Sequence, residues 1–325
     1  MNTEQEDMAA YNTFLMGENI LIIVCQILSA TGNGFISYLF VKLRKINGLQ
    51  MLWVLSITDL LFAISVFPYM LYYVIGWTPT VLNYDGFMVI KLSFPLTMQY
   101  KITLVIGLAI ASDRIQALFF SVHYRQRNNH YSYIVCTLLT GVIWGTFDCI
   151  LEIFWNPVQS NPGCAAVGCF NGSEYRRYWG NSNMLLSVIM LVLTLVLGIK
   201  LKTVNQKSSK SVLAHSKQDS QRQANRLTMA IILISVCFHA IPSSLVGVAD
   251  YFGINVFSKL GPFYILGLVL GGVCNSIAYI TLHKELKNAA LKAILPQKLQ
   301  PTTTIAISKS TTRAAGHSSV LNTIK

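Results

Sequence analysis

The sequence predicts an all-α membrane protein, a bundle of seven transmembrane helices. The chain has 325 residues, is 53% hydrophobic and only 12% charged, and has a mean hydropathy of +0.50. A soluble core does not need repeated apolar runs of about 20 residues, whereas a bilayer does. Seven such runs occur, the fifth and shortest of which we expect to begin near Trp179; they cover residues 20–41, 51–73, 87–111, 133–154, 184–199, 227–248 and 261–282.

We divide the chain into four parts. An extracellular segment (1–19) precedes the seven-helix domain (20–282), and a disordered cytoplasmic tail (296–325) ends the chain. Between them, residues 283–295 place apolar side chains among lysines in the pattern of an amphipathic helix that contacts lipid at the inner membrane face. These apolar side chains are Leu286, Ala290, Leu291 and Ile294.

The positive charges predict the orientation. With the N-terminus outside, 20 of the 25 Lys and Arg residues fall in inner segments and only four in outer loops. This asymmetry predicts a multi-pass plasma-membrane protein with an extracellular N-terminus and a cytoplasmic C-terminus. The net charge of +12 follows from this topology, so we expect no nucleic-acid partner.

Two of the seven cysteines, Cys164 and Cys169, lie in an outer loop, where oxidation is permitted. A bridge between them would close a short loop; two free thiols are the alternative. The other five cysteines are expected to be small buried hydrophobic residues, and we expect no metal or cofactor. The same loop carries Asn171-Gly172-Ser173, the one acceptor sequence for N-glycosylation in the chain.

Polar side chains deep in the apolar runs mark candidate sites, because burying them in a membrane is costly. Asp59 lies about nine residues into the second run, and we expect Asn33 and Asn275 to be its neighbours in a polar relay or sodium-like site. In the sixth run, Pro242 predicts a bend that can act as a hinge. The nearby His239 is either a hydrogen-bonded bundle residue or a ligand contact.

Lys101 lies 13 residues before Arg114 along the third helix, roughly 20 Å from its inner end at 1.5 Å per residue. At that depth the side chain is too short to place its ammonium group at the membrane surface. Lys101 therefore either pairs with an internal acid or binds an anionic group of the ligand. In the fourth helix Trp144, Asp148 and Glu152 share a face at steps of four residues. The two acids are candidate partners for Lys101 or for a ligand, unless they are hydrated carboxylates at the helix end.

The inner end of the third run carries Ser112-Asp113-Arg114, followed by a basic, aromatic stretch that includes Tyr124 and Arg125. Together with Gly32-Asn33, Asp59, Trp144 and Asn275-x-x-x-Tyr279, this pattern resembles the rhodopsin-like G-protein-coupled receptors. Three departures are clear: no cysteine precedes the third helix, Pro242 is displaced from the usual position after Cys237-Phe238, and Ser276 replaces a common proline.

These departures look like the nematode serpentine chemoreceptors, most nearly class BC. The likeness rests on the segments 162–170 and 175–179, on Tyr124-Arg125, on Phe238-x-x-x-Pro242-Ser243 and on Gly261-Pro262. The resemblance implies chemosensation in the cilia of sensory neurons through a heterotrimeric G protein. A second copy of the receptor is a further candidate partner, in a receptor dimer. It assigns coupling and activation to Asp113, Arg114, Tyr124, Arg125, Asn275 and Tyr279.

For the ligand, we expect a small-molecule cue bound in the outer half of the bundle, with Lys101, Asp148, Glu152 and His239 as candidate contacts. A receptor for a peptide or neuromodulator is the alternative. A ligand-gated channel or transporter would predict inverted repeats or paired broken helices, which the two halves do not show. An enzyme would need a set of metal ligands or an activated nucleophile. The histidines are not spaced in the sequence as metal ligands are, which argues against an enzyme.

Overall fold

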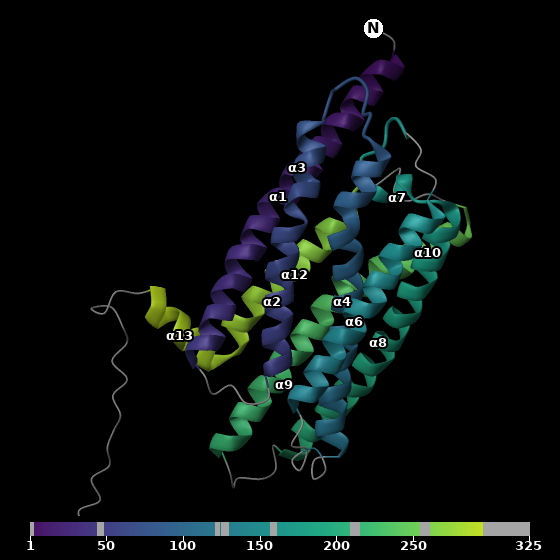
Figure 1. Ribbon diagram of the computed structural model, residues 1–325. Helices are drawn as coiled ribbons and strands as arrows, with labels where there is room; N and C mark the ends of the chain where they lie inside the picture. The colour runs from purple at the N-terminus through teal and green to yellow at the C-terminus, as the bar shows by residue number, and fades with distance from the viewer. Residues whose placement is uncertain are drawn as a thin grey trace, which may run out of the picture.

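The computed structural model describes residues 3–43, 49–120, 124, 130–156, 161–208, 215–253 and 261–294. It confirms the all-α, seven-helix membrane fold, because seven helices are long and apolar enough to cross a bilayer (Figure 1). The candidate spans are Glu6–Leu43, Gln50–Ile75, Gly86–Phe119, Tyr131–Trp155, Ser173–Thr203, Gln223–Ala249 and Phe263–Leu282.

Several helices are longer than the apolar runs that predicted them. Helix α1 begins at Thr3, so most of the segment 1–19 is helical, and α4 continues past Asp113 to Phe119. A hydropathy pattern marks only the part of a helix that crosses the lipid core, whereas the backbone hydrogen bonds continue beyond it. The elements are α1 (Thr3–Leu43), α2 (Gln50–Ser65), α3 (Phe67–Ile75), α4 (Gly86–Phe119), α6 (His130–Trp155), α7 (Val167–Phe170), α8 (Ser173–Ser208), α9 (His215–Ser235), η1 (Val236–Ala240), α10 (Ile241–Tyr251), α12 (Phe263–Leu282) and α13 (Lys284–Ile294).

Two of the spanning segments are interrupted near prolines. The second span changes from α2 to α3 at Val66, and Pro68 occupies the first turn of α3. In the sixth span, the π-helical turn η1 lies directly before Pro242. Proline lacks the N–H that would continue the helical ladder, and a π-turn is a common way to accommodate this loss. Pro242 therefore coincides with an irregular segment in the middle of the sixth helix.

The helix α4 forms the centre of the bundle. It lies against α6, α8 and α2, and buried residues occur along most of its length. Apolar residues form two main layers. In the orientation predicted from the sequence, the outer layer contains Tyr69, Tyr73 and Tyr100, and the inner layer contains Ile106 and Tyr279. The outer layer is rich in aromatic side chains, which gives that half of the bundle large, rigid surfaces around any ligand.

A short loop closes the outer end of the bundle. Cys164 and Cys169 form a disulfide, and Ala165 and Ala166 between them are buried in the outer apolar layer. The N–H of Val167 donates to the Tyr69 hydroxyl at 3.2 Å. The loop is therefore part of the core. In Figure 1, α7 lies within this loop at the upper end of the bundle.

Two expectations about surface residues need correction or refinement. Cys136 and Cys237 are exposed and not buried, because they lie on faces of α6 and of the sixth span that point away from the bundle. In α13, Leu286 and Ala290 are buried against the inner apolar layer, whereas Ile294 is exposed. The helix α13 turns away from the bundle beside the lower end of α1 (Figure 1).

Candidate functional site

A small cavity of about 40 Å³ lies in the outer half of the bundle. Its walls come from α4, from the disulfide loop with α7, from the outer turns of α8, and from α10 and α12. The residues around it are mainly apolar or aromatic, with a few polar groups; they include Thr97, Tyr100, Asn171, Tyr175, Trp179 and Tyr264. This composition is typical of a small-molecule site.

Tyr100 connects this cavity to the sixth helix. Its ring makes edge-on and tilted contacts with Tyr264 and Trp179, at centroid distances of 5.4 and 5.2 Å. Its hydroxyl donates to the backbone oxygen of His239 at 2.8 Å. Because His239 belongs to η1, just before Pro242, a cavity-lining side chain is bonded directly to the irregular segment of the sixth helix.

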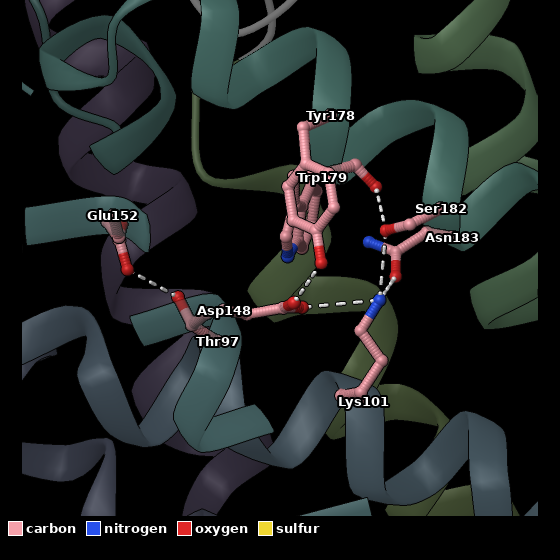
Figure 2. Close-up of polar contacts among 8 residues, drawn as sticks. All are labelled: Thr97, Lys101, Asp148, Glu152, Tyr178, Trp179, Ser182 and Asn183. Carbon is pink, nitrogen blue, oxygen red and sulfur yellow. Dashed lines mark hydrogen bonds and ion pairs between the residues drawn. The ribbon is translucent and has the colours of Figure 1, made fainter. Parts of the chain in front are cut away.

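Lys101 is not among the residues that line this cavity; its side chain lies in a polar network between α4, α6 and α8 (Figure 2). Its ammonium group lies 3.2 Å from Asp148 Oδ2 and donates to Asn183 Oδ1 at 2.6 Å and Ser182 Oγ at 3.1 Å. It also lies 5.0 Å from the centre of the Trp144 ring. Of the two alternatives for Lys101, the structure shows pairing with an internal acid.

The other predicted ligand candidates differ in position. Asp148 accepts a hydrogen bond from the Tyr178 hydroxyl at 2.8 Å in addition to the contact with Lys101. Glu152 is also fully buried, but it faces Thr97, whose hydroxyl donates to Glu152 Oε2 at 3.0 Å. Both acids are fully buried, so neither is a hydrated carboxylate at the helix end. Figure 2 shows Glu152 separated from the Lys101 network.

Asn171 belongs to the wall of the cavity. Its side chain is 9% exposed, and its Oδ1 accepts a hydrogen bond from Asn156 at 2.7 Å. Its backbone oxygen accepts from Arg176 Nη1 at 2.6 Å. The glycosylation of Asn171 stays a prediction from its acceptor sequence.

The polar residues in the middle of the bundle join the first, second and seventh helices. Asn275 donates to Asp59 Oδ2 at 3.0 Å, so these two residues are in direct contact. Asn33 instead donates to the backbone oxygen of Gly272 at 3.0 Å. The hydroxyl of Tyr279 donates to the backbone oxygen of Leu52 at 2.7 Å, which ties the inner ends of the seventh and second helices.

At the inner end of α4, Asp113 has two polar contacts. Its Oδ2 lies 3.7 Å from Arg114 Nη2 and accepts a hydrogen bond from the Tyr124 hydroxyl at 3.1 Å. The side chain of Arg114 is 12% exposed. The predicted coupling residue Arg125 lies outside the described residues.

A larger cavity of about 820 Å³ opens at the inner ends of α8, α9 and α12, beside α13. Three of its lining residues are cationic, namely Arg226, Lys284 and Lys287. His283 precedes α13, and its Nδ1 accepts the N–H of Leu286 at 3.4 Å. Burial lowers the pKa of His283, and the charge of Glu285 partly opposes this effect.

Sequence analysis missed Tyr100, Tyr264 and Gln99 as site residues. Gln99 donates to the backbone oxygen of Thr58 at 3.1 Å and so joins α4 to α2. Tyrosine and glutamine inside a transmembrane run need hydrogen-bond partners, which is a signal that could have selected Gln99 and Tyr100. Tyr264 lies at the outer end of its helix, where aromatic residues are common, and has no comparable signal.

The comparisons agree with this architecture. The family model for the serpentine type 7TM GPCR chemoreceptor Srbc matches residues 11–285. The matched region contains all seven spanning helices, from near the start of α1 to the beginning of α13. It includes every residue that lines the smaller cavity and all but Lys287 of those that line the larger one. A search of curated proteins gave no significant match.

Proposed function

The chain belongs to the Srbc family of serpentine seven-transmembrane chemoreceptors, and from this premise we propose that it detects a small-molecule cue in its outer cavity and activates a heterotrimeric G protein. It is an integral membrane protein of a receptor family, not of an enzyme family. The identity of the site, the coupling residues and the orientation in the membrane are parts of this proposal.

The observation that carries the proposal is the hydrogen bond between Tyr100 and the backbone of His239. Tyr100 lines the outer cavity, and its hydroxyl lies 2.8 Å from a carbonyl oxygen of η1. A ligand that shifts the Tyr100 ring therefore acts on the sixth helix beside Pro242. This gives cue binding a direct physical connection to the helix that we propose as the moving element.

We describe signalling as an equilibrium between two states. The cue shifts this equilibrium only through its different affinities for the two states. In the resting state Asp113 holds Arg114, with help from Tyr124; in the active state the inner part of the sixth helix moves and Arg114 contacts the G protein. Asn275, Asp59 and Tyr279 connect the seventh helix to this change.

The inner cavity supports a cytoplasmic partner. It lies between the inner ends of α8, α9 and α12, and its cationic residues suit an acidic segment of a partner protein. We propose that the N-terminus is extracellular and that this cavity faces the cytoplasm, in agreement with the excess of Lys and Arg in the inner segments. We place the receptor in the plasma membrane of sensory cilia.

The test is a G-protein activation assay in cells that express the full chain and are challenged with fractionated nematode secretions. Arg114→Ala should abolish the response, whereas the control Arg177→Ala, which removes an exposed arginine of α8, should retain it. Surface expression of each variant is measured in parallel. Ion flux without G-protein activation, unchanged in Arg114→Ala, would contradict the proposal and favour a channel.

A further inference from the structure

We propose that the outer cavity selects a small cationic molecule, in particular a short-chain amine, and that Glu152 supplies the balancing negative charge. This inference rests on the proposed function, because it takes the outer cavity as the cue site. It names the chemical class of the cue.

The first observation is a contrast between two acids one helical turn apart on α6. Asp148 has an internal cation, since Lys101 lies 3.2 Å from it. Glu152 is equally buried, yet within the described part of the chain it makes no ion pair, and its Oε1 atom accepts no hydrogen bond. Glu152 is therefore a buried carboxyl group without a balancing charge.

The second observation is the position of Glu152 beside the cavity. Thr97, which donates to Glu152 Oε2 at 3.0 Å, also lines the cavity. Asn171 and Tyr175, two further lining residues, also lie near the Glu152 carboxyl group. The carboxyl group thus lies directly behind the wall of the cavity, among three of its lining side chains.

A cationic ligand would provide what the protein itself does not. An ionised carboxylate buried without a partner is strongly disfavoured, and an opposite charge nearby offsets that cost. The aromatic rings of Tyr100, Trp179 and Tyr264 add favourable surfaces for an ammonium group, because cations are attracted to aromatic faces. Both effects favour an amine over a carboxylic acid.

Neither Lys101 nor Arg176 favours an anionic cue. Lys101 already contacts Asp148, Asn183 and Ser182. Arg176 lines the cavity, but its Nη1 donates to the backbone oxygens of Gly168 and Asn171 at 3.3 and 2.6 Å. An anion would have to compete with these contacts, and it would gain no opposite charge from the Glu152 carboxyl group.

The cavity volume limits the size of the cue. A volume of about 40 Å³ corresponds to roughly three water molecules, since one needs about 10–15 Å³ by this measure. A molecule with about five non-hydrogen atoms therefore fits with only small movements of the walls. Isobutylamine has this size, and isobutyrate and isobutanol are its anionic and neutral counterparts.

The experiment measures the binding of these three probes to the purified full chain in lipid nanodiscs, through the shift of the thermal unfolding midpoint with probe concentration. We expect isobutylamine to raise the midpoint at lower concentrations than isobutanol, and isobutyrate to have no effect. Equal or stronger binding of isobutyrate would overturn the proposal and assign the site to an anion at Arg176.

Variants then test the role of Glu152. We expect Glu152→Gln to weaken isobutylamine binding at least tenfold, and Glu152→Asp, which keeps the charge, to retain most of it. The matched control is Glu174→Gln, which removes an exposed acid in the first turn of α8 and should leave binding unchanged. Unchanged binding in Glu152→Gln would overturn the proposal, and if that variant does not fold, the ranking of the three probes on the native chain still decides.

This binding assay contains no G protein, so the two proposals can fail separately. Glu152-dependent binding of isobutylamine without any G-protein activation would leave the ligand class standing and contradict the coupling. Cue-induced activation that depends on Arg114, together with binding of isobutyrate in preference to isobutylamine, would leave the receptor function standing and contradict the ligand class.

Discussion

Lys101 Nζ and Asp148 Oδ2 lie 3.2 Å apart, and neither side chain is exposed. The pair joins α4 to α6, and the hydrogen bonds of Lys101 to Asn183 and Ser182 add α8 to the same network. Within a membrane, such a network can form only if almost every charge and donor finds a partner. The main role of Lys101 and Asp148 is therefore structural, because their network holds three helices together.

Replacing one member of this pair should destabilise the receptor strongly. We expect Lys101→Met to cost about 3–5 kcal/mol, because Asp148 would remain buried without its cation. The double variant Lys101→Met/Asp148→Leu should recover much of this loss, because no buried charge remains. The measurement is the thermal unfolding midpoint of the purified receptor. Equal losses in the single and double variants would show that the ion pair is not the source of the effect.

Much of the fold could be predicted from the sequence because its main signals are local. Each apolar run reports its own helix, and the inner Lys and Arg residues predict an orientation without any tertiary contact. The full lengths of α1 and α4 could not be predicted, since their ends lie outside the lipid core where hydropathy gives no signal. The exposure of Cys136 and Cys237 depends on helix rotation, which one sequence leaves open.

The candidate site was predictable only in part. Depth in the membrane selected Lys101 and Asp59, because buried charge is costly wherever it occurs. Glu152 was selected by its helical spacing from Trp144 and Asp148. The choice between an internal acid and a ligand for Lys101 depends on how α4 and α6 face each other, and no local pattern contains that information. The same holds for Tyr100, whose importance comes from a contact with a residue 139 positions away.

Close contact between the sixth and seventh helices should make Gly267 intolerant of a side chain. A Cβ atom at Gly267 would lie 2.8 Å from the backbone oxygen of Phe238, and a backbone atom cannot move aside cheaply. We expect Gly267→Ala to lower the free energy of unfolding by about 1–3 kcal/mol.

The matched control for this substitution is Gly17→Ala. Gly17 is also helical, but a Cβ there meets nothing within 4 Å, so alanine should be neutral or stabilise by up to about 1 kcal/mol. Thermal unfolding of both variants is the measurement. A Gly267→Ala receptor as stable as Gly17→Ala would contradict the close approach of these helices.

The Tyr100 hydroxyl should matter more for signalling than for binding. Tyr100→Phe keeps the ring contacts with Trp179 and Tyr264 but removes the donor to the His239 carbonyl. One hydrogen bond contributes about 0.5–1.5 kcal/mol net, which corresponds to roughly a two- to tenfold change in an equilibrium. We expect cue-induced G-protein activation to fall by such a factor, with cue affinity nearly unchanged.

Its control is Tyr73→Phe, which also removes a buried hydroxyl, one that accepts a hydrogen bond from Tyr69 at 3.2 Å. Tyr73 belongs to α3 and to the outer apolar layer, so its hydroxyl has no contact with η1 among the described residues. Concentration–response curves and binding curves for both variants separate the two effects. Equal losses of activation in both would contradict a specific role for the bond to His239.

His283 should make the stability of the receptor sensitive to mild acid. It occupies the N-cap position of α13, and its Nδ1 accepts the N–H of Leu286 at 3.4 Å, which requires an unprotonated nitrogen. Burial lowers its pKa below the ordinary value of 6.5, so the fold favours the neutral ring. The stabilisation is therefore complete above pH 6.5 and is lost as the pH falls through the folded-state pKa.

His283→Asn provides the test of this dependence, because asparagine caps a helix well but does not titrate. We expect the unfolding midpoint of the native receptor to decrease between pH 7 and 5 more steeply than that of the variant. For one titrating group, the free energies of unfolding of the two receptors can differ in their pH dependence by at most about 1.4 kcal/mol per pH unit. Both receptors are measured at the same set of pH values. All other titrating groups are common to both proteins, and their contributions cancel in the difference. Parallel pH profiles would show that the cap at α13 does not depend on the protonation of His283, and the destabilisation in acid would then belong to carboxyl groups elsewhere in the chain.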